Sequence, residues 1–160
     1  MAQYRSVGVS RPKFSQCFGN AYNDDDTVTI TANLTTSDSV DLIRIPAGTR
    51  LTDLAFIAQD LDTGTTLTAN IGWRSATGAS ITVVTPSGSS SAASNATAFA
   101  SALNSFQSAQ ASGARLDIAF QPITFNDDVF ITLIPAANGT GISGSPIVTT
   151  LAKGQVLGVK

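Results

Sequence analysis

The chain has 160 residues, a length that corresponds to one domain. Only 12% of the residues are charged, about half the share in an ordinary soluble protein, and 18 Ser and 20 Thr residues take their place. The sequence has no Glu, no His and a single Cys, which excludes a histidine-based nucleophile system, a Cys/His zinc site and an intramolecular disulfide. We therefore expect no cofactor and a protein that is not an enzyme.

Hydropathy and charge argue against a membrane or a nucleic acid as a partner. No apolar stretch approaches the roughly 18 residues that span a bilayer, and the N-terminus lacks the contiguous apolar segment of a signal peptide. We expect a soluble protein made in the cytoplasm. The net charge is −2, and the few basic residues would release too few counterions to bind a polyanion strongly.

The first 26 residues differ in charge from the rest of the chain. Residues 1–23 carry a net charge of +3, whereas residues 24–160 carry −5. Residues 1–26 have no strand or helix periodicity and include four aromatic residues, which are rare in solvated tails. We interpret 1–26 as an extended arm that docks on a protein, with a disordered terminus as the alternative. The candidate partner-binding residues are Arg5, Arg11, Lys13, Phe14 and Phe18.

After the arm, the pattern changes to short strands separated by Gly, Pro and Asp. Residues 27–34 alternate apolar side chains with Thr and Asn, as a half-buried antiparallel strand does. Trp73 falls in phase with Leu67 and Ile71, so we expect it in the core, with a sugar-stacking platform as the alternative. Strands are expected at 27–34, 40–45, 51–58, 66–74, 81–85, 115–120, 128–135, 147–150 and 155–159, with 86–91 as a flexible connector.

One segment departs from the strand pattern. Within residues 92–112, Phe99, Leu103 and Phe106 recur at i, i+4 and i+7 on an Ala-rich background. A Ser precedes this segment and a Gly follows it, as helix start and stop signals do. We therefore expect one amphipathic helix at about 92–112, packed against a sheet.

These elements predict an all-β fold, an antiparallel β-sandwich with one inserted helix. The expected organisation is an N-terminal arm over 1–26 and a single sandwich domain over 27–160. The alternation of strands and turns does not determine strand order. A jelly roll is the form we expect, and that step rests partly on a family resemblance.

Two groups of Asp residues could carry chemistry. Asp62-Thr63-Gly64 matches the short signature of aspartic proteases, but it occurs once where that mechanism needs two carboxylates, so we interpret it as a turn. The acidic run 24–26, or Asp60 with Asp62, could offer oxygen ligands to calcium, although the spacing excludes an EF-hand. For 24–26 the alternative is a solvated run that ends the arm.

The order of several motifs resembles that in a known family. One expected strand ends in Ile-Pro-Ala-Gly at 45–48, another leads to Asp-Leu-Asp-Thr-Gly at 60–64, and 127–133 reads Asp-Asp-Val-Phe-Ile-Thr-Leu. Over residues 40–135 the chain resembles the small virion proteins of tailed bacteriophages that are encoded near the major capsid protein. The resemblance implies a jelly-roll head protein that decorates, or cements, the capsid.

The same resemblance implies partners and a location. Such proteins sit as trimers on the outer shell, so the expected partners are the major capsid protein and further copies of this chain, and the expected location is the capsid exterior of the virion. A bound trimer touches several subunits at once, which multiplies weak individual contacts. Two alternatives remain open: another virion component, such as a neck, tail or fibre protein, and a carbohydrate-binding β-sandwich module.

Overall fold

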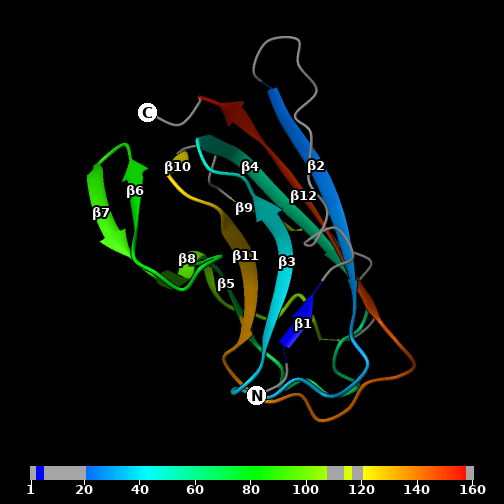
Figure 1. Cartoon of the computed structure of the whole chain (residues 1–160). Helices are drawn as coiled ribbons and strands as arrows, with labels where there is room; N and C mark the ends of the chain where they lie inside the picture. Colours follow the sequence, from blue (N-terminus) through cyan, green and yellow to red (C-terminus); the bar gives the residue numbers. More distant parts are fainter. Residues whose placement is uncertain (1–2, 6–20, 108–113, 117–120, 158–160) are drawn as a thin grey trace.

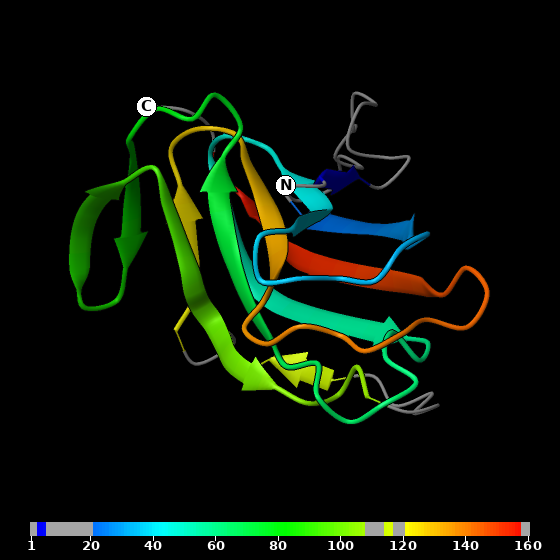
Figure 2. The ribbon, with the colours of Figure 1, turned by 90° about the horizontal axis from the view of Figure 1, so that it is seen from below.

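The computed structural model describes residues 3–5, 21–107, 114–116 and 121–157 of the chain. In these ranges all regular structure is β, and the strands form two sheets that enclose a common core (Figure 1, Figure 2). Within the same ranges no helix is long and apolar enough to cross a membrane. The all-β expectation is therefore confirmed, and the two packed sheets are consistent with the expected sandwich.

The first sheet, sheet A, has five strands in the order β1, β3, β11, β5, β8. Neighbouring strands are antiparallel except β1, which runs parallel to β3. β1 therefore forms one edge of sheet A and β8 forms the other. The bounds are Gln3–Arg5 for β1, Ser39–Ile45 for β3, Val129–Pro135 for β11, Ala69–Ser75 for β5 and Ser94–Leu103 for β8.

The second sheet, sheet B, runs in the order β2, β12, β4, β10, β6, β7, and β9 also pairs with β4. All of its pairs are antiparallel. The short strands β10 and β9 share one side of β4, because they pair with its successive halves. The bounds are Ala21–Thr29 for β2, Ile147–Val156 for β12, Thr49–Ala58 for β4, Ile123–Phe125 for β10, Ala114–Leu116 for β9, Ile81–Thr85 for β6 and Gly88–Ala92 for β7.

Aromatic contacts connect the two sheets through the core. Trp73 of β5 is 3% exposed, and its ring meets the ring of Phe125 of β10 edge-on at 5.6 Å. Phe56 of β4 stacks on Phe106, which follows β8, with ring centroids 5.1 Å apart. Burial of a large apolar side chain contributes about 1.5–3 kcal/mol. The prediction that Trp73 belongs to the core is confirmed, and a buried indole cannot serve as an exposed platform for a sugar.

The predicted helix at 92–112 is wrong over its described part. Residues 94–103 form β8, which pairs with β5 at the edge of sheet A. The helical spacing placed Phe99 and Leu103 on one stripe, but a strand ladder satisfies the backbone of this Ser- and Thr-containing segment equally well, and tertiary pairing decides between the two. Phe106 reaches the core from a turn in which the N–H of Gln107 bonds to the Asn104 carbonyl at 3.1 Å. Residues 108–112 lie outside the described ranges.

The pairing of β8 with β5 is irregular, and it depends on a glycine. Between the pairs Ile71–Ala100 and Trp73–Asn95, β8 has more residues than β5, so its chain bulges. A Cβ on Gly72 would lie 2.1 Å from the carbonyl oxygen of Asn95. No real side chain fits at that distance, so glycine is required for β8 to approach β5 this closely.

Other boundaries also differ from the sequence-based expectation. β2 ends at Thr29 and not at residue 34, β5 begins at Ala69 and not at residue 66, and one strand, β12, replaces the expected strands 147–150 and 155–159 over its described residues. β2 begins at Ala21 and not at residue 27, because the long strand β12 pairs with it through the acidic run 24–26. Tyr22 anchors this start: its side chain is buried, and its hydroxyl donates to the Arg44 carbonyl at 3.1 Å. The expected connector 86–91 is a turn followed by β7, so 81–92 is a hairpin.

Candidate functional site: a buried carboxylate at the edge of sheet A

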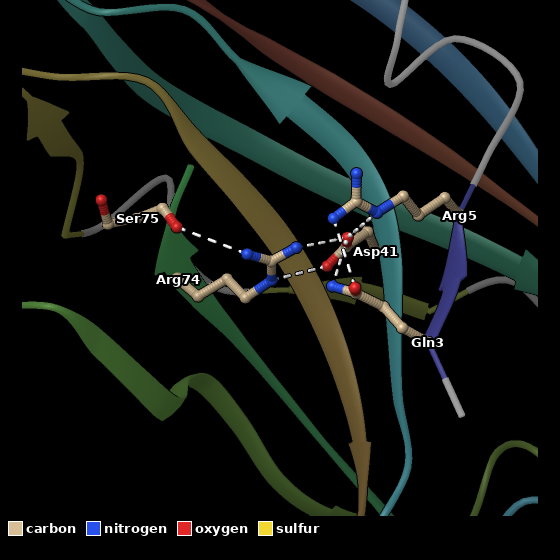
Figure 3. Close-up of polar contacts among 5 residues, drawn as sticks. All are labelled: Gln3, Arg5, Asp41, Arg74 and Ser75. Atoms are coloured by element: carbon tan, nitrogen blue, oxygen red, sulfur yellow. Dashed lines mark hydrogen bonds and ion pairs between the residues drawn. The ribbon is translucent and has the colours of Figure 1, made fainter. Parts of the chain in front are cut away.

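The most strongly bonded charged cluster at the edge of sheet A centres on Asp41 of β3. Its side chain is fully buried, in a strand whose other described neighbours are mostly apolar. Arg74 of β5 reaches across β11 and binds it with two parallel hydrogen bonds, Nε to Oδ1 at 2.8 Å and Nη2 to Oδ2 at 2.6 Å (Figure 3). This bidentate geometry is the strong form of an Arg–carboxylate pair, so Arg74 compensates the burial of the charge.

The N-terminal strand adds two more groups to the same carboxylate. Arg5 Nε lies 3.2 Å from Asp41 Oδ2, and Gln3 Nε2 donates to that oxygen at 3.1 Å. The two β1 side chains also bond to each other, since Arg5 Nη2 donates to Gln3 Oε1 at 3.2 Å. The register explains this convergence: Arg5 is the strand partner of Asp41. β1 is therefore attached by side chains as well as by its backbone.

An aromatic ring completes the cluster. Phe130 of β11 is 7% exposed, and the guanidinium groups of Arg74 and Arg5 lie 4.6 Å and 5.6 Å from its ring centroid. Cations at such distances are attracted by the face of the ring. The arrangement holds one acid, two permanent cations and a ring. The Asp41 carboxylate is the group among them that could act as a base or a nucleophile, but it is fully buried and both of its oxygens are bonded to Arg74, Arg5 or Gln3. The chemistry of the cluster is that of docking a strand.

The predicted partner-binding residues are only partly described. Of that set, the structure places Arg5 in the Asp41 cluster, where it contacts the chain's own sheet. The others, Arg11, Lys13, Phe14 and Phe18, lie outside the described residues, so their partner-binding role stays a prediction. The division of the chain at residue 26 also stays a prediction.

Sequence reasoning missed Asp41 and Arg74. A signal was present, because Asp41 interrupts an apolar strand and a charge in a buried strand needs a partner. The sequence did not identify that partner, since Arg74 is 33 residues away and Gln3 is 38 residues away.

A second buried carboxylate, Asp62, lies in the loop between β4 and β5. Each of its oxygens accepts three hydrogen bonds: Oδ1 from the Gly64 and Thr140 N–H groups and the Thr140 hydroxyl, and Oδ2 from the Thr66 and Leu67 N–H groups and the Thr66 hydroxyl, all at 2.8–3.2 Å. Burial by itself would raise the pKa of Asp62, but these hydrogen bonds outweigh it and hold the pKa well below the usual range.

This geometry decides between the interpretations of Asp62. A protease carboxylate must share a proton with a second one, whereas the oxygens of Asp62 are surrounded by N–H and O–H donors from its own loop and from residue 140. These hydrogen bonds favour a structural role for Asp62 in the loop that joins β4 of sheet B to β5 of sheet A. The same donors would repel a cation. Among the described residues, no three or more Asp, Glu, His or Cys side chains lie together so that they could hold a metal ion.

The surface also has two grooves, neither of which is lined by Asp41 or Asp62. One, of about 490 Å³, lies between the β6–β7 hairpin and β8, and its lining includes Val83, Phe99, two Ser residues and the largely buried Trp73. The other, of about 540 Å³, lies beside Ile57, which is 49% exposed, and is lined also by Pro146 and Ile147. The linings include Ser and Thr hydroxyls and, in the second groove, the carboxylate of Asp60.

The comparisons with known proteins concern the fold. The chain matches no protein-family model and no curated protein. Its structure is similar to a chain of the cyanophage Pam1 capsid asymmetric unit, with a TM-score of 0.62 and 19% identity, covering 92% of this chain and 91% of that one. It is also similar to a chain of the capsid of Ralstonia phage GP4, with a TM-score of 0.64 and 20% identity, covering 99% and 100%. The chain therefore shares its fold, along nearly its whole length, with chains from two phage capsids.

Proposed function

We propose that this chain is a non-enzymatic structural protein of a phage virion that binds the outside of the major capsid protein shell and stabilises the head. The observation that carries the proposal is the end-to-end match, 99% of this chain against 100% of a chain in the Ralstonia phage GP4 capsid. A match over the full length of both chains favours an equivalent unit over a shared module in a larger protein. The motif order at 45–48, 60–64 and 127–133 independently supports a head protein.

We also propose that the sandwich is a jelly roll. In chain order, β2, β3, β4 and β5 alternate between sheets B and A, and β8 stays in sheet A beside β5. The short strands β9 and β10 then lie in sheet B, β11 in sheet A and β12 in sheet B. The last strand, β12, lies between β2 and β4, and β11 lies between β3 and β5. Such interleaving of the chain ends is what two intertwined Greek keys produce. In this view the β6–β7 hairpin and β1 are additions to an eight-stranded plan in which β9 and β10 together fill one position.

The arm and the oligomeric state complete the proposal. Residues 1–23 are basic and the body is acidic, so the arm favours contact with acidic protein surfaces, its own or a neighbour's. We assign partner binding to Arg5, Arg11, Lys13, Phe14 and Phe18, and we assign a homotrimer to the assembled protein. Three linked copies bind a shell by multivalency, which makes weak contacts sufficient.

The test uses shells of the major capsid protein from the phage that encodes this chain, prepared without it. We expect the purified chain to have three times its 16.4 kDa mass by light scattering, to sediment with the shells and to raise their thermal disruption temperature. Failure to bind shells, with binding to tail or neck assemblies instead, would favour the other virion component.

The arm is tested by removing residues 1–20, which spares β2. A variant with Arg5, Arg11 and Lys13 all changed to Gln keeps the arm's length without its charge, and the exposed body residue Lys153 changed to Gln is the matched control. We expect weaker shell binding in the first two proteins and unchanged binding in the third. Equal binding by all three would contradict the arm's role.

A further inference from the structure

The Asp41 site is divided between the sandwich and a separable strand. Arg74 alone makes two hydrogen bonds to the carboxylate, so Asp41 keeps a charged partner when β1 is absent. β1 has only three residues, and it adds Arg5 and Gln3 to a carboxylate that is already paired. Departure of β1 therefore exposes a strand edge but leaves no buried charge unpaired, which is the costly event in a protein interior.

The connection between β1 and the sandwich is long. Fifteen residues, 6–20, join Arg5 to the start of β2, and a chain of that length can span up to about 50 Å at ~3.3 Å per residue. That reach exceeds the diameter of the domain, about 40 Å for a chain of this size. The covalent geometry thus allows β1 to reach a β3 edge other than its own. The basic charge of residues 1–23 and the acidic charge of the body favour docking on either copy.

We propose that β1 docks on β3 of a second copy of this chain, so that neighbouring copies exchange N-terminal strands through their Asp41 sites. The inference rests on the proposed assembly of several copies. The contacts of β1 specify which segment binds this edge. Tyr4 pairs with Val40 along the edge of β3, and Arg5 pairs with the Asp41 carboxylate over the Phe130 ring.

Exchange needs no new contact, because each copy donates one strand and receives an identical one. In such domain swapping, whether β3 binds its own β1 or a neighbour's depends on the length of the linker 6–20 and on the local concentration of other copies. The edge of β3 that β1 covers is a site to which any extended segment can add, and the side chains select this one. The exchanged strands would fasten one copy to the next.

The experiment uses disulfide trapping in the full chain with Cys17→Ser as background. Gln3 and Ser39 are strand partners, and neighbouring strands place their Cα atoms about 5 Å apart, within the range that a disulfide bridges. A tagged chain carrying only Gln3→Cys is co-expressed with an untagged chain carrying only Ser39→Cys. After mild oxidation we expect a covalent dimer of mixed mass, formed in the soluble oligomer and on shells.

Two controls define the result. Pairing Gln3→Cys with Ser89→Cys, on the hairpin at the far side of the sandwich (Figure 1), is expected to give no more than background dimer. Adding Asp41→Asn to the Ser39→Cys chain is expected to lower the dimer yield several-fold. A chain carrying both Gln3→Cys and Ser39→Cys tests whether β1 docks on its own chain. If this chain forms only the intrachain disulfide and no covalent dimer appears, strand exchange is overturned.

The outcomes separate this inference from the proposed function. A trimer that binds shells but yields no mixed dimer overturns strand exchange and leaves the capsid role standing. A mixed dimer from a protein that does not bind shells supports exchange and removes the capsid role. Absence of the mixed dimer both in solution and on shells counts against exchange, whether or not the intrachain disulfide forms.

Discussion

The molecule buries two carboxylates in different ways. Asp62 has no cation beside it among its described hydrogen-bond partners and is stabilised by six N–H and O–H donors from two loops. Asp41 has two arginines and a glutamine, drawn from two other strands of the same sheet. Both side chains are fully buried, so the two sites differ in the protein groups that take the place of hydrating water.

The groups that replace water around each carboxylate determine the role of the site. The donors around Asp62 are mostly backbone groups whose positions are fixed by the loop, so the carboxylate and the loop conformation depend on each other. The partners of Asp41 are long side chains with solvent-accessible ends, 25% exposed for Arg74 and 48% for Arg5. Asp62 therefore fixes a loop, whereas Asp41 is bound through both oxygens by Arg74 and through one oxygen by the more exposed Arg5.

The largest effect is expected from Asp62→Asn. The carboxamide keeps the shape, but its NH2 group must face three donors whichever oxygen it replaces. We expect a loss of about 2–4 kcal/mol in the free energy of unfolding, because buried donors lose their acceptor. Urea unfolding followed by the fluorescence of Trp73, at one fixed chain concentration, measures it. Asp60→Asn is the control, with a loss below about 1 kcal/mol, since Asp60 accepts one bond. Equal losses would contradict the role of Asp62.

Acid should reveal the same site without a mutation. The pKa of Asp62 is lower in the folded chain than its unfolded value of about 3.9, so its contribution to stability is complete above that pH and is lost as the pH falls further. We expect the free energy of unfolding to decrease between pH 5 and pH 3 more steeply in the wild type than in Asp62→Asn. Parallel curves for the two proteins would show that Asp62 does not titrate as the hydrogen bonds require.

A smaller effect is expected from Asp41→Asn. The amide retains one acceptor, and both arginines can turn their exposed ends to water, so we expect a loss of about 1–3 kcal/mol. Hydrogen exchange of a peptide covering β1 should accelerate at the same time, because the strand loses its charged anchor. Asp128→Asn, which breaks a more exposed pair with Arg44, is the comparison. Unchanged exchange in β1 would mean that the backbone alone holds it.

The smallest effect is expected from Arg5→Gln. Its side chain is 48% exposed, so we expect a loss of about 0.5–1 kcal/mol at low salt that diminishes at high salt. Thermal unfolding at two ionic strengths measures the difference between wild type and variant. A loss as large as that of Asp41→Asn, or one independent of salt, would contradict a weak, solvent-screened contact between Arg5 and Asp41.

Sequence patterns predicted those parts of the fold that depend on local alternation. Residues 81–85 form a strand as expected, and the predicted strand at 128–135 begins within a residue of β11. Trp73, in phase with Leu67 and Ile71, is in the core. The segment 92–112 was misjudged because an i, i+4, i+7 spacing also arises by chance in an Ala- and Ser-rich strand, and pairing with β5 outweighs it.

The candidate site depended on contacts distant in sequence. Asp41 meets Arg74 because β11 lies between their strands, and no local signal places β11 there. Thr140 bonds to Asp62 across 78 residues of sequence. Asp41 could be recognised as a charge in an apolar strand, whereas Asp62 lies in a polar segment that reads as a turn. The partners of both carboxylates depend on how distant segments are arranged, which alternation does not determine.

The hairpin of β6 and β7 offers a place to add sequence. Its turn residues Pro86 and Ser87 lie between the strand partners Thr85 and Gly88, and nothing lies within 4 Å of a Cβ built on Gly88. The hairpin extends from the side of the sandwich opposite β1 (Figure 1, Figure 2). Exposed turns of this kind tolerate insertions. A peptide genetically inserted between Pro86 and Ser87 would be displayed once per copy, so an assembly of many copies would become a regular array for antigens or enzymes.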